Sequence, residues 1–338
     1  MSIKTFIIIS VKEIIIKKEF SNQRADKFIK KYLNDAPLSF IYKLFRKKDI
    51  KVNKHWIKEN YILKEDDVLQ IYVTDDQLNE FNNPKKIETI KDDINIVYED
   101  ENILIINKPD GLLVHGDEKE KRITLTNKVL SYLYKKGEYN PNEAGFTPGP
   151  VHRLDRNTSG LIIYAKNILA SQELMKELQS HENITKEYLA LVYGEVDESG
   201  EINAPLKKNE EEGIVRVTSI KNGGKPSITK YEKVISNEDY SLVKVKLVTG
   251  RTHQIRVHFA YINHPLVGDK KYGVFNKNVK DVELEKNMNQ FLHSYKLSFI
   301  NLSGNLSYLN GKSFVGKLDE KKIKILSKIY TNFDSSNI

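Results

Sequence analysis

The sequence predicts an α+β protein, with a small N-terminal domain followed by a large domain that contains a mixed, mainly antiparallel sheet with flanking helices. The chain has 338 residues, enough for two domains at about 150 residues each. Short apolar runs typical of strands dominate the larger part, for example NILIINKP, GLIIYAK and EYLALVYGEV, and helical patterns are fewer. A polar stretch without a clear period, residues 75–92, is interpreted as the linker between the two domains, which we place at 21–74 and 93–338.

The composition excludes several kinds of chemistry. There is no cysteine, which rules out disulfides, thiolate zinc sites, iron–sulfur clusters and cysteine nucleophiles. The formal net charge of +8 favours an acidic partner, nucleic acid first. A chain that is simply rich in lysine would carry the same excess, so the distribution of charge matters more than its sum.

The N-terminal segment, residues 1–20, is not expected to be a targeting signal. Its apolar run is short and is broken by Lys12 and Glu13, without a cleavage site of small residues. No stretch of the chain approaches the roughly 20 apolar residues that cross a bilayer. We therefore predict a cytoplasmic protein that does not contact membranes.

The first domain is predicted to contain two short helices followed by strands. Apolar residues recur at helical spacing near its start, with Ser21 as the expected N-cap. These residues are Ala25, Phe28, Tyr32 and Leu33. Pro37 opens the second helix in PLSFIYKLFRKK, and the strand-like runs IKVN and YILKEDDVLQIYV complete the domain.

Basic residues gather at the end of the second predicted helix and beyond it. Between Tyr42 and Lys58 there are seven of them against one acid, Asp49. They are Lys43, Arg46, Lys47, Lys48, Lys51, Lys54 and Lys58. Such a cluster can follow a phosphate backbone, but a solvated helix face has the same composition, and the residues alone leave both interpretations open.

The segment VHRLDRNTSGLIIYAK, residues 151–166, combines a polar loop with the start of a strand. Arg153 and Asp155 flank Leu154, so both side chains would project to the same side of an extended loop. Asp155 could be a nucleophile, a base or half of a structural ion pair. The spacing does not choose among these roles.

The motifs of the large domain resemble those of a known family. HRLDRNTSGL resembles the catalytic motif of the RluA-type pseudouridine synthases. IINKPDGLLVHG is similar to the family's first core strand, KEYLALVYGEV to its tyrosine motif, VTGRTHQIRVHFAYINHPLVGDKKYG to its arginine motif, and FLHSYKLSF to its closing strand. APLKKNEEEGIVRV and GGKPSITKYE resemble the RluC-like branch, which modifies large-subunit ribosomal RNA. The first domain resembles the small RNA-binding domain with an αL motif, so the similarity covers about residues 20–300.

The resemblance assigns roles to the matching positions. Asp155 matches the catalytic aspartate, Tyr188 the tyrosine beneath the target base, and Arg256 the arginine that pairs with the aspartate. Arg153 matches the position that enters the RNA stack as the uridine is extruded. Arg251 is a candidate for binding substrate phosphate or for supporting the loop. Substrate binding by the first domain is assigned to Lys43, Arg46, Lys47 and Lys48.

The activity that the resemblance implies is isomerisation of specific uridines to pseudouridine. The expected substrate is 23S rRNA or a ribosomal assembly intermediate. The N1–C1′ bond breaks, the uracil rotates, and C5 bonds to C1′. This chemistry needs no cofactor and no metal, and we expect the enzyme to work as a monomer. His152 and His253 are expected to be hydrogen-bonded residues that support the loops, with Lys108 and Pro109 at the rim of a cleft.

Two other functions are less consistent with these motifs. A non-catalytic rRNA-binding assembly factor would need phosphate contacts but no carboxylate, so the set Asp155, Tyr188 and Arg256 argues against it. A glycoside hydrolase would need a second acid beside Asp155, and the motifs do not place one there.

Overall fold

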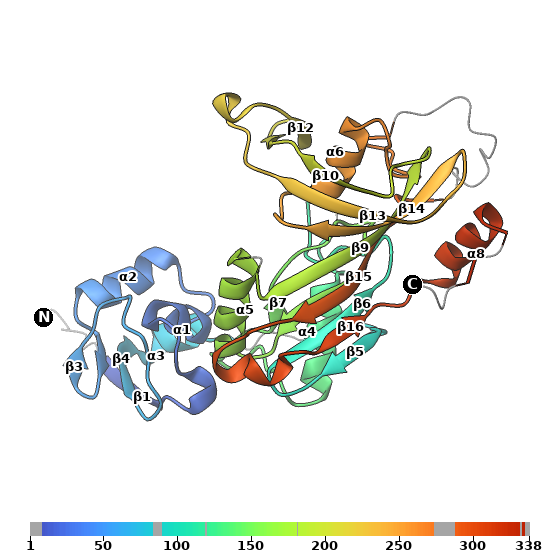
Figure 1. Ribbon diagram of the computed structural model, residues 1–338. Helices are drawn as coiled ribbons and strands as arrows, with labels where there is room; N and C mark the ends of the chain where they lie inside the picture. The colour runs from blue at the N-terminus through green and yellow to red at the C-terminus, as the bar shows by residue number, and fades with distance from the viewer. Residues whose placement is uncertain are drawn as a thin grey trace, which may run out of the picture. The chain divides into compact units, whose positions relative to one another are not determined.

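The computed structural model describes residues 9–83, 90–118, 120–180, 182–273, 288–331 and 333–334 (Figure 1). Parts of the predicted N-terminal segment, linker and C-terminal tail lie outside these ranges. The described chain divides into two compact units. Unit 1 contains the residues up to Asp92 together with 129–149 and 166–171, and unit 2 contains the remainder.

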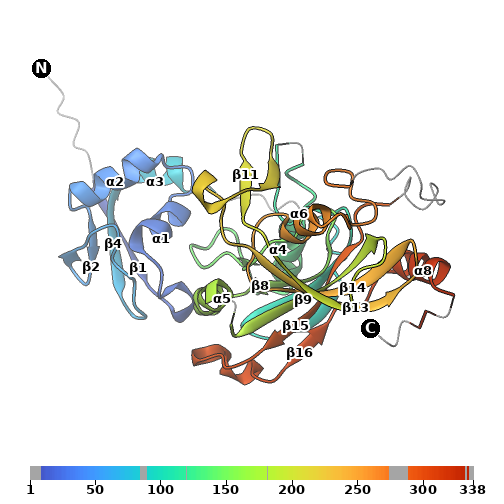
Figure 2. The same cartoon turned by 45° about the horizontal axis from the view of Figure 1, so that its top comes forward.

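Unit 1 is a four-stranded sheet covered by short helices (Figure 2). The strands are β1 (Ile9–Ile15), β2 (Ile50–Val52), β3 (His55–Trp56) and β4 (Val68–Thr74), in the order β1-β4-β2-β3. The helices are α1 (Ala25–Tyr32) and α2 (Leu38–Arg46), with a 3-10 turn at Lys18–Phe20. Apolar side chains from both helices and from the sheet form its core, for example Phe28, Ile41, Ile50 and Ile71.

Two sequence expectations for the start of this unit were wrong. The N-terminal segment is not separate, because β1 pairs antiparallel with β4 along its whole length, from Ile9–Thr74 to Ile15–Val68. Ser21 does not cap α1: the helix begins after Arg24, and the Ser21 hydroxyl donates to the Lys18 carbonyl.

The predicted linker starts with a helix, α3 (Asp75–Phe81). The Thr74 hydroxyl accepts from the Gln77 backbone N–H, and the Gln77 side chain accepts from the Thr74 backbone N–H. This is a capping box, and its signature, TDDQ, is present in the sequence.

Unit 2 is organised around a ten-stranded sheet, which confirms the predicted mixed, mainly antiparallel class. The main path is β10 (Ser199–Asn203), β13 (Ile228–Ser236), β14 (Tyr240–Leu247), β9 (Ile184–Tyr193), β15 (Leu292–Phe299), β8 (Ser159–Ala165), β6 (Ile103–Lys108) and β5 (Ile96–Glu99). Two short strands complete it, β7 (Gly149–Pro150) beside β8 and β16 (Ser313–Val315) beside β15. Strands β8 and β15 run parallel. The pairs β10–β13, β13–β14, β14–β9, β9–β15, β8–β6, β6–β5 and β15–β16 are antiparallel.

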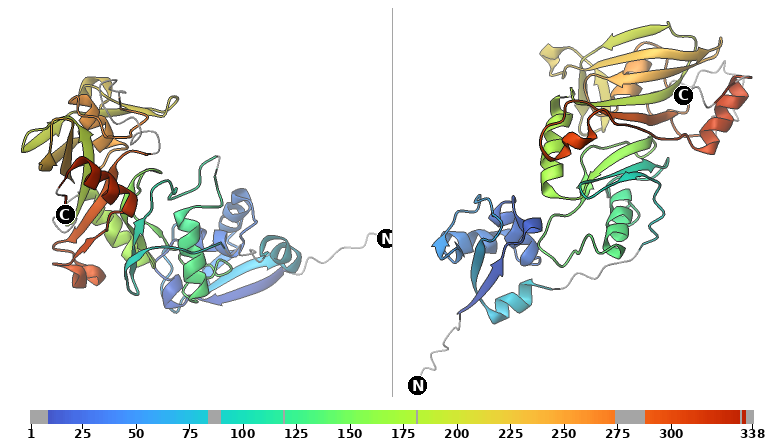
Figure 3. Two further views of the ribbon diagram at one scale, coloured as in Figure 1. Left: turned by 90° about the vertical axis from the view of Figure 1, so that its right-hand side faces the viewer. Right: turned by 60° about the horizontal axis from the view of Figure 1, so that its bottom comes forward.

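Unit 2 also contains helices and a hairpin (Figures 1 and 3). Its helices are α6 (Gln254–Tyr261), α8 (Glu320–Ile329) and most of α5 (Ile168–Ser180), with 3-10 turns at Ile220–Asn222 and Gly304–Leu309. Helix α4 (Leu125–Lys135) begins in unit 2, and most of its residues belong to unit 1. Strands β11 (Leu206–Asn209) and β12 (Ile214–Val217) form the hairpin. Helix α6 contacts β12 and β13, and Ile325 and Leu326 of α8 pack against apolar residues of β9 and β14. No helix in the described ranges is long and apolar enough to span a membrane.

The parallel contact between β8 and β15 depends on Gly160. Its φ is +106°, and a Cβ built there would lie 2.2 Å from the Ser294 carbonyl oxygen. Strand β8 is buried along its whole length. Only a glycine lets the two backbones approach this closely.

Candidate active site

The loop that carries Asp155 lies between β7 and β8 and is held by hydrogen bonds at several points. The Thr158 backbone N–H donates to the Asp155 carbonyl at 3.1 Å, which closes a turn. Gln290 Nε2 donates to Thr158 Oγ1 at 2.9 Å. The Ile163 backbone N–H donates to His152 Nε2 at 3.2 Å, so this imidazole is a neutral acceptor and burial lowers its pKa to about 3. His152 therefore supports the loop, as predicted.

Lys108 is buried beneath this loop and is not at a cleft rim, so that expectation was wrong. Lys108 is 1% exposed. The ammonium donates to the carbonyls of Pro109, Leu112 and Arg156 at 2.9, 2.8 and 2.9 Å. Burial lowers the pKa of Lys108 to about 7, whereas three carbonyl acceptors favour the ammonium, because only that form has three N–H groups. Lys108 joins the end of β6 to the residue that follows Asp155.

Arg256 bridges two aspartates. It lies on α6, and its Nη1 donates to Asp155 Oδ2 at 3.0 Å. Its Nε and Nη2 donate to Asp269 Oδ2 and Oδ1 at 2.7 and 2.8 Å in a bidentate pair. The Asp269 side chain is 1% exposed, against 29% for Asp155. The arginine thus has one buried, fully engaged carboxylate that fixes it and one accessible carboxylate that it holds in place.

Each buried member of this bridge carries its charge. Burial by itself would lower the pKa of Arg256, but the Asp269 and Asp155 carboxylates more than offset it, and the pKa lies above the usual value. Burial would raise the pKa of Asp269, but the hydrogen bonds and charge of Arg256 and two backbone N–H groups hold it below the usual value. Asp269 is therefore an anion that cannot donate a proton as a second acid.

His253 and Tyr272 form the other side of the Asp155 carboxylate. The Val215 backbone N–H donates to the Tyr272 hydroxyl at 3.0 Å, and that hydroxyl lies 2.6 Å from His253 Nδ1. A hydroxyl that accepts from Val215 has its proton free to donate to Nδ1. The His253 Nε2–H then faces Asp155 Oδ2, 3.7 Å away. Burial lowers the pKa of His253, and the Asp155 carboxylate offsets this in part.

Tyr188 lies on β9, opposite Val245 of β14 and Ser294 of β15. It is 6% exposed. Burial raises the pKa of its hydroxyl, and the nearby Asp155 carboxylate raises it further. The phenol is therefore neutral at pH 7.

The remaining predicted residues lie outside this cluster. Arg153 is exposed on the Asp155 loop. Arg251 is exposed before α6, and its Nε donates to the Pro226 carbonyl at 3.2 Å. The four basic residues assigned to substrate binding in the first domain, Lys43, Arg46, Lys47 and Lys48, are exposed on unit 1.

Sequence reasoning missed two members of the cluster, Asp269 and Tyr272. Both stand in the VGDKKYG segment, where the signal was an acid and an aromatic residue shortly after the helix that carries Arg256. In the described part of the chain, His, Asp and Glu side chains form no group that could hold a metal ion. The cluster offers an accessible carboxylate with fixed orientation, next to a neutral phenol.

The chain is similar to known proteins along most of its length. Residues 102–261 match the family model described as RNA pseudouridylate synthase. Ribosomal large subunit pseudouridine synthase C of Haemophilus influenzae is 35% identical over 335 residues, which cover 95% of each chain. The protein of the same name from Vibrio parahaemolyticus is 35% identical over 86% of this chain and 88% of its own. An uncharacterized RNA pseudouridine synthase of Mycoplasma capricolum is 34% identical over 91% of this chain and 98% of its own.

A solved structure agrees at the level of the fold. Human RNA pseudouridylate synthase domain containing 4 superposes with a TM-score of 0.55 at 23% identity. The match covers 70% of this chain and 92% of the human chain.

Proposed function

The chain belongs to the RNA pseudouridylate synthase family, as an isomerase of the RluA/RluC type that acts on RNA, and from this premise we propose that it converts specific uridines of 23S rRNA to pseudouridine. The observation that carries the proposal is the accessible Asp155 carboxylate held by the buried Arg256–Asp269 pair. The names of the Haemophilus and Vibrio relatives support the large ribosomal subunit as the substrate.

Asp155 is the proposed catalytic residue. The reaction breaks N1–C1′ and forms C5–C1′, while C5 loses a proton and N1 gains one, so the composition of the nucleotide is unchanged. A carboxylate can attack C1′ or the base, or can stabilise positive character at C1′ as in glycosidic cleavage. Arg256 supports each route, because its hydrogen bond of 3.0 Å fixes the position of the Asp155 carboxylate oxygen and its positive charge stabilises the anion.

Tyr188 and Arg153 are proposed to handle the base. A phenol ring can stack on the flipped uracil, and a hydroxyl close to the carboxylate can assist removal of the C5 proton. Arg153 is exposed on the same loop as Asp155, where a planar guanidinium can fill the space that the uridine vacates. Arg251 is proposed to contact phosphate.

Unit 1 is proposed to bind the RNA backbone through Lys43, Arg46, Lys47 and Lys48. Their exposure and the net charge of +8 support this role. We further propose that the enzyme acts as a monomer in the cytoplasm, on 23S rRNA or on ribosomal assembly intermediates.

The test is tritium release from 23S rRNA transcribed with C5-tritiated uridine, by the native protein beside Asp155→Asn. We expect release by the native protein and loss of release by the variant, with RNA binding intact. Asn nearly preserves the side-chain shape, and Arg256 stays fixed by Asp269. No release from 23S rRNA or from immature large subunits, with binding intact, would contradict the proposed substrate. Equal loss of binding and release in the variant would make Asp155 structural.

A further inference from the structure

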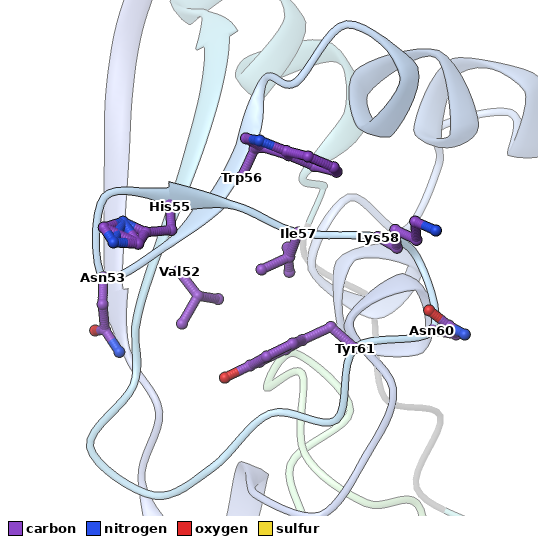
Figure 4. Close-up of a pocket in the computed structure, with 8 residues that line it drawn as sticks. All are labelled: Val52, Asn53, His55, Trp56, Ile57, Lys58, Asn60 and Tyr61. Atoms are coloured by element: carbon purple, nitrogen blue, oxygen red, sulfur yellow. The ribbon is translucent and has the colours of Figure 1, made fainter.

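Unit 1 has a cavity of about 520 Å³ that lies outside the proposed active site. Eight residues line it: Val52, Asn53, His55, Trp56, Ile57, Lys58, Asn60 and Tyr61. They come from β2, β3 and the loop that follows (Figure 4). The volume lies within the range of about 300–1,000 Å³ that is usual for small-molecule sites.

The walls of this cavity are aromatic and aliphatic. Figure 4 shows the rings of Trp56 and Tyr61 on opposite sides, with the side chains of Val52 and Ile57 between them. Trp56 is 52% exposed, which is unusual for the largest apolar side chain. The Tyr61 ring is fixed, because its hydroxyl donates to Asp67 Oδ2 at 3.1 Å. Such walls suit a flat aromatic ligand that can stack.

Two lysines lie at the cavity or beside its aromatic wall. Lys58 lines the cavity, and Lys48 Nζ lies 4.9 Å from the centre of the Trp56 ring. Across the ranges that the structure describes, no ion pair involves any of the seven basic residues between Tyr42 and Lys58. An aromatic surface beside unneutralised lysines is complementary to a nucleotide, which combines a flat base with an anionic phosphate.

Two of these lysines occupy positions that are poor for backbone stability. Lys48 follows α2 with φ +62°, and Lys54 lies in the turn between β2 and β3 with φ +70°. Glycine or asparagine suits such left-handed positions better. The Lys48 side chain lies over the Trp56 ring, so this lysine can contribute to ligand binding although its backbone position is unfavourable.

We propose that the cavity binds an unpaired nucleotide of the RNA substrate, with its base against Trp56 and its phosphate near Lys48 and Lys58. His55 and Asn60 are exposed at the rim, where they can hydrogen-bond the edge of the base. The proposal rests on the proposed function only in taking RNA as the substrate. Its consequence is that the enzyme selects RNA in which a single-stranded nucleotide can reach unit 1, in addition to the uridine that is flipped into the active site.

The native protein carries its own probe for this site. Trp56 is the only tryptophan in the chain, so all tryptophan emission reports on the cavity wall. We would titrate the full-length protein with a single-stranded oligouridylate of about ten nucleotides, within the usual site size of stacking platforms, and separately with an RNA duplex of the same length. The single strand should quench the emission saturably, at the same midpoint as binding measured by anisotropy. The duplex should bind through its phosphates with little quenching.

Variants separate stacking from charge. Trp56→Ala should weaken single-strand binding about 5- to 150-fold, the range for loss of one stacked base, and Trp56→Phe should stay within about 3-fold because it keeps a ring. Ile15→Ala is the matched control, since it removes another exposed apolar side chain, 64% exposed, from the same sheet. Lys48→Gly should raise the melting temperature, because it relieves the left-handed position, and should lower the salt slope of binding by about one.

Two results would overturn the proposal. One is RNA binding, seen by anisotropy, that leaves Trp56 emission unchanged. The other is Trp56→Ala binding the single strand as tightly as Ile15→Ala does. Neither readout needs turnover, and Asp155→Asn should quench like the native protein. Failure of this proposal is therefore distinct from failure to find pseudouridine in 23S rRNA.

Discussion

Asp155 and Asp269 both bind Arg256, and we expect Asp269 to contribute more to the free energy of unfolding, which can be measured. Asp269→Asn removes the buried carboxylate that receives two hydrogen bonds from Arg256. Asn keeps one acceptor but turns an amide toward the guanidinium. Removing one partner of a buried ion pair costs about 3–5 kcal/mol of unfolding free energy. For a unit of about 220 residues, this lowers the melting temperature by about 6–20 °C.

Asp155→Asn is the matched comparison on the same arginine. The Asp155 side chain is 29% exposed and receives a single bond from Arg256. Solvent screening reduces the contribution of such a pair to about 1 kcal/mol or less, so the melting temperature should change by about 4 °C or less.

Calorimetry and circular dichroism would follow both variants. Trp56 lies in unit 1, so a transition without a change in tryptophan emission belongs to unit 2. Equal shifts for the two variants, or a shift below about 4 °C for Asp269→Asn, would refute the idea that the buried pair is the fixed anchor.

The same pair predicts how stability depends on pH. The pKa of Asp269 is held below its usual value in the folded protein. The stabilisation is therefore complete above the unfolded pKa, near 4, and is lost as the pH falls below it toward the folded value. In Asp269→Asn this part of the acid sensitivity of unit 2 should be absent, and a native-like acid profile would contradict the assignment.

Two further predictions concern the supports of the Asp155 loop. Gly160→Ala should lower the free energy of unfolding by at least about 3 kcal/mol or abolish folding of unit 2, because its Cβ would meet the Ser294 carbonyl. The control is Gly111→Ala, at a position that is also left-handed but has open space around it, and it should cost about 1–2 kcal/mol. Equal melting temperatures for the two variants would contradict the close approach of β8 and β15. The pKa of Lys108 is about 7 in the folded protein, below its unfolded value near 10.4. Between pH about 7 and about 10.4 the unfolded chain therefore binds more protons than the folded one. The free energy of unfolding rises with pH across this range, by up to about 1.4 kcal/mol per pH unit. Lys108→Met should lose this rise in urea midpoints compared at pH about 7 and about 9, and a pH-independent difference between the two proteins would count against the assigned pKa.

Some features of unit 1 were present in the sequence but were not recognised. The capping box TDDQ marks the start of α3, and the β-branched run around Ile9–Ile15 is suited to a strand. Both are local signals. The polar composition of residues 75–92 is also typical of a linker, and a short apolar run near the N-terminus is also typical of a targeting segment, so neither signal predicts its element without the pairing and capping contacts.

The sequence by itself determined the fold class and the position of the polar loop at 151–160, and the family resemblance predicted Asp155, Tyr188 and Arg256 as site residues. Such features depend on residue type and on spacing within one stretch of chain, which is the information that a linear pattern contains. The second helix of unit 1, predicted from Pro37, begins at the next residue for the same reason.

The tertiary structure alone decided which side chains meet. Asp269 stands 13 positions after Arg256, and Asp155 stands 101 positions before it, so neither spacing corresponds to a helical or strand period. Lys108 looks like a surface residue by type, yet packing buries it and supplies the three carbonyls that satisfy it. Gly160 is required because Ser294, far along the chain, lies against it. Contacts of this kind arise only when separate strands and helices pack together, because burial and partner geometry are set by the neighbours that folding brings in.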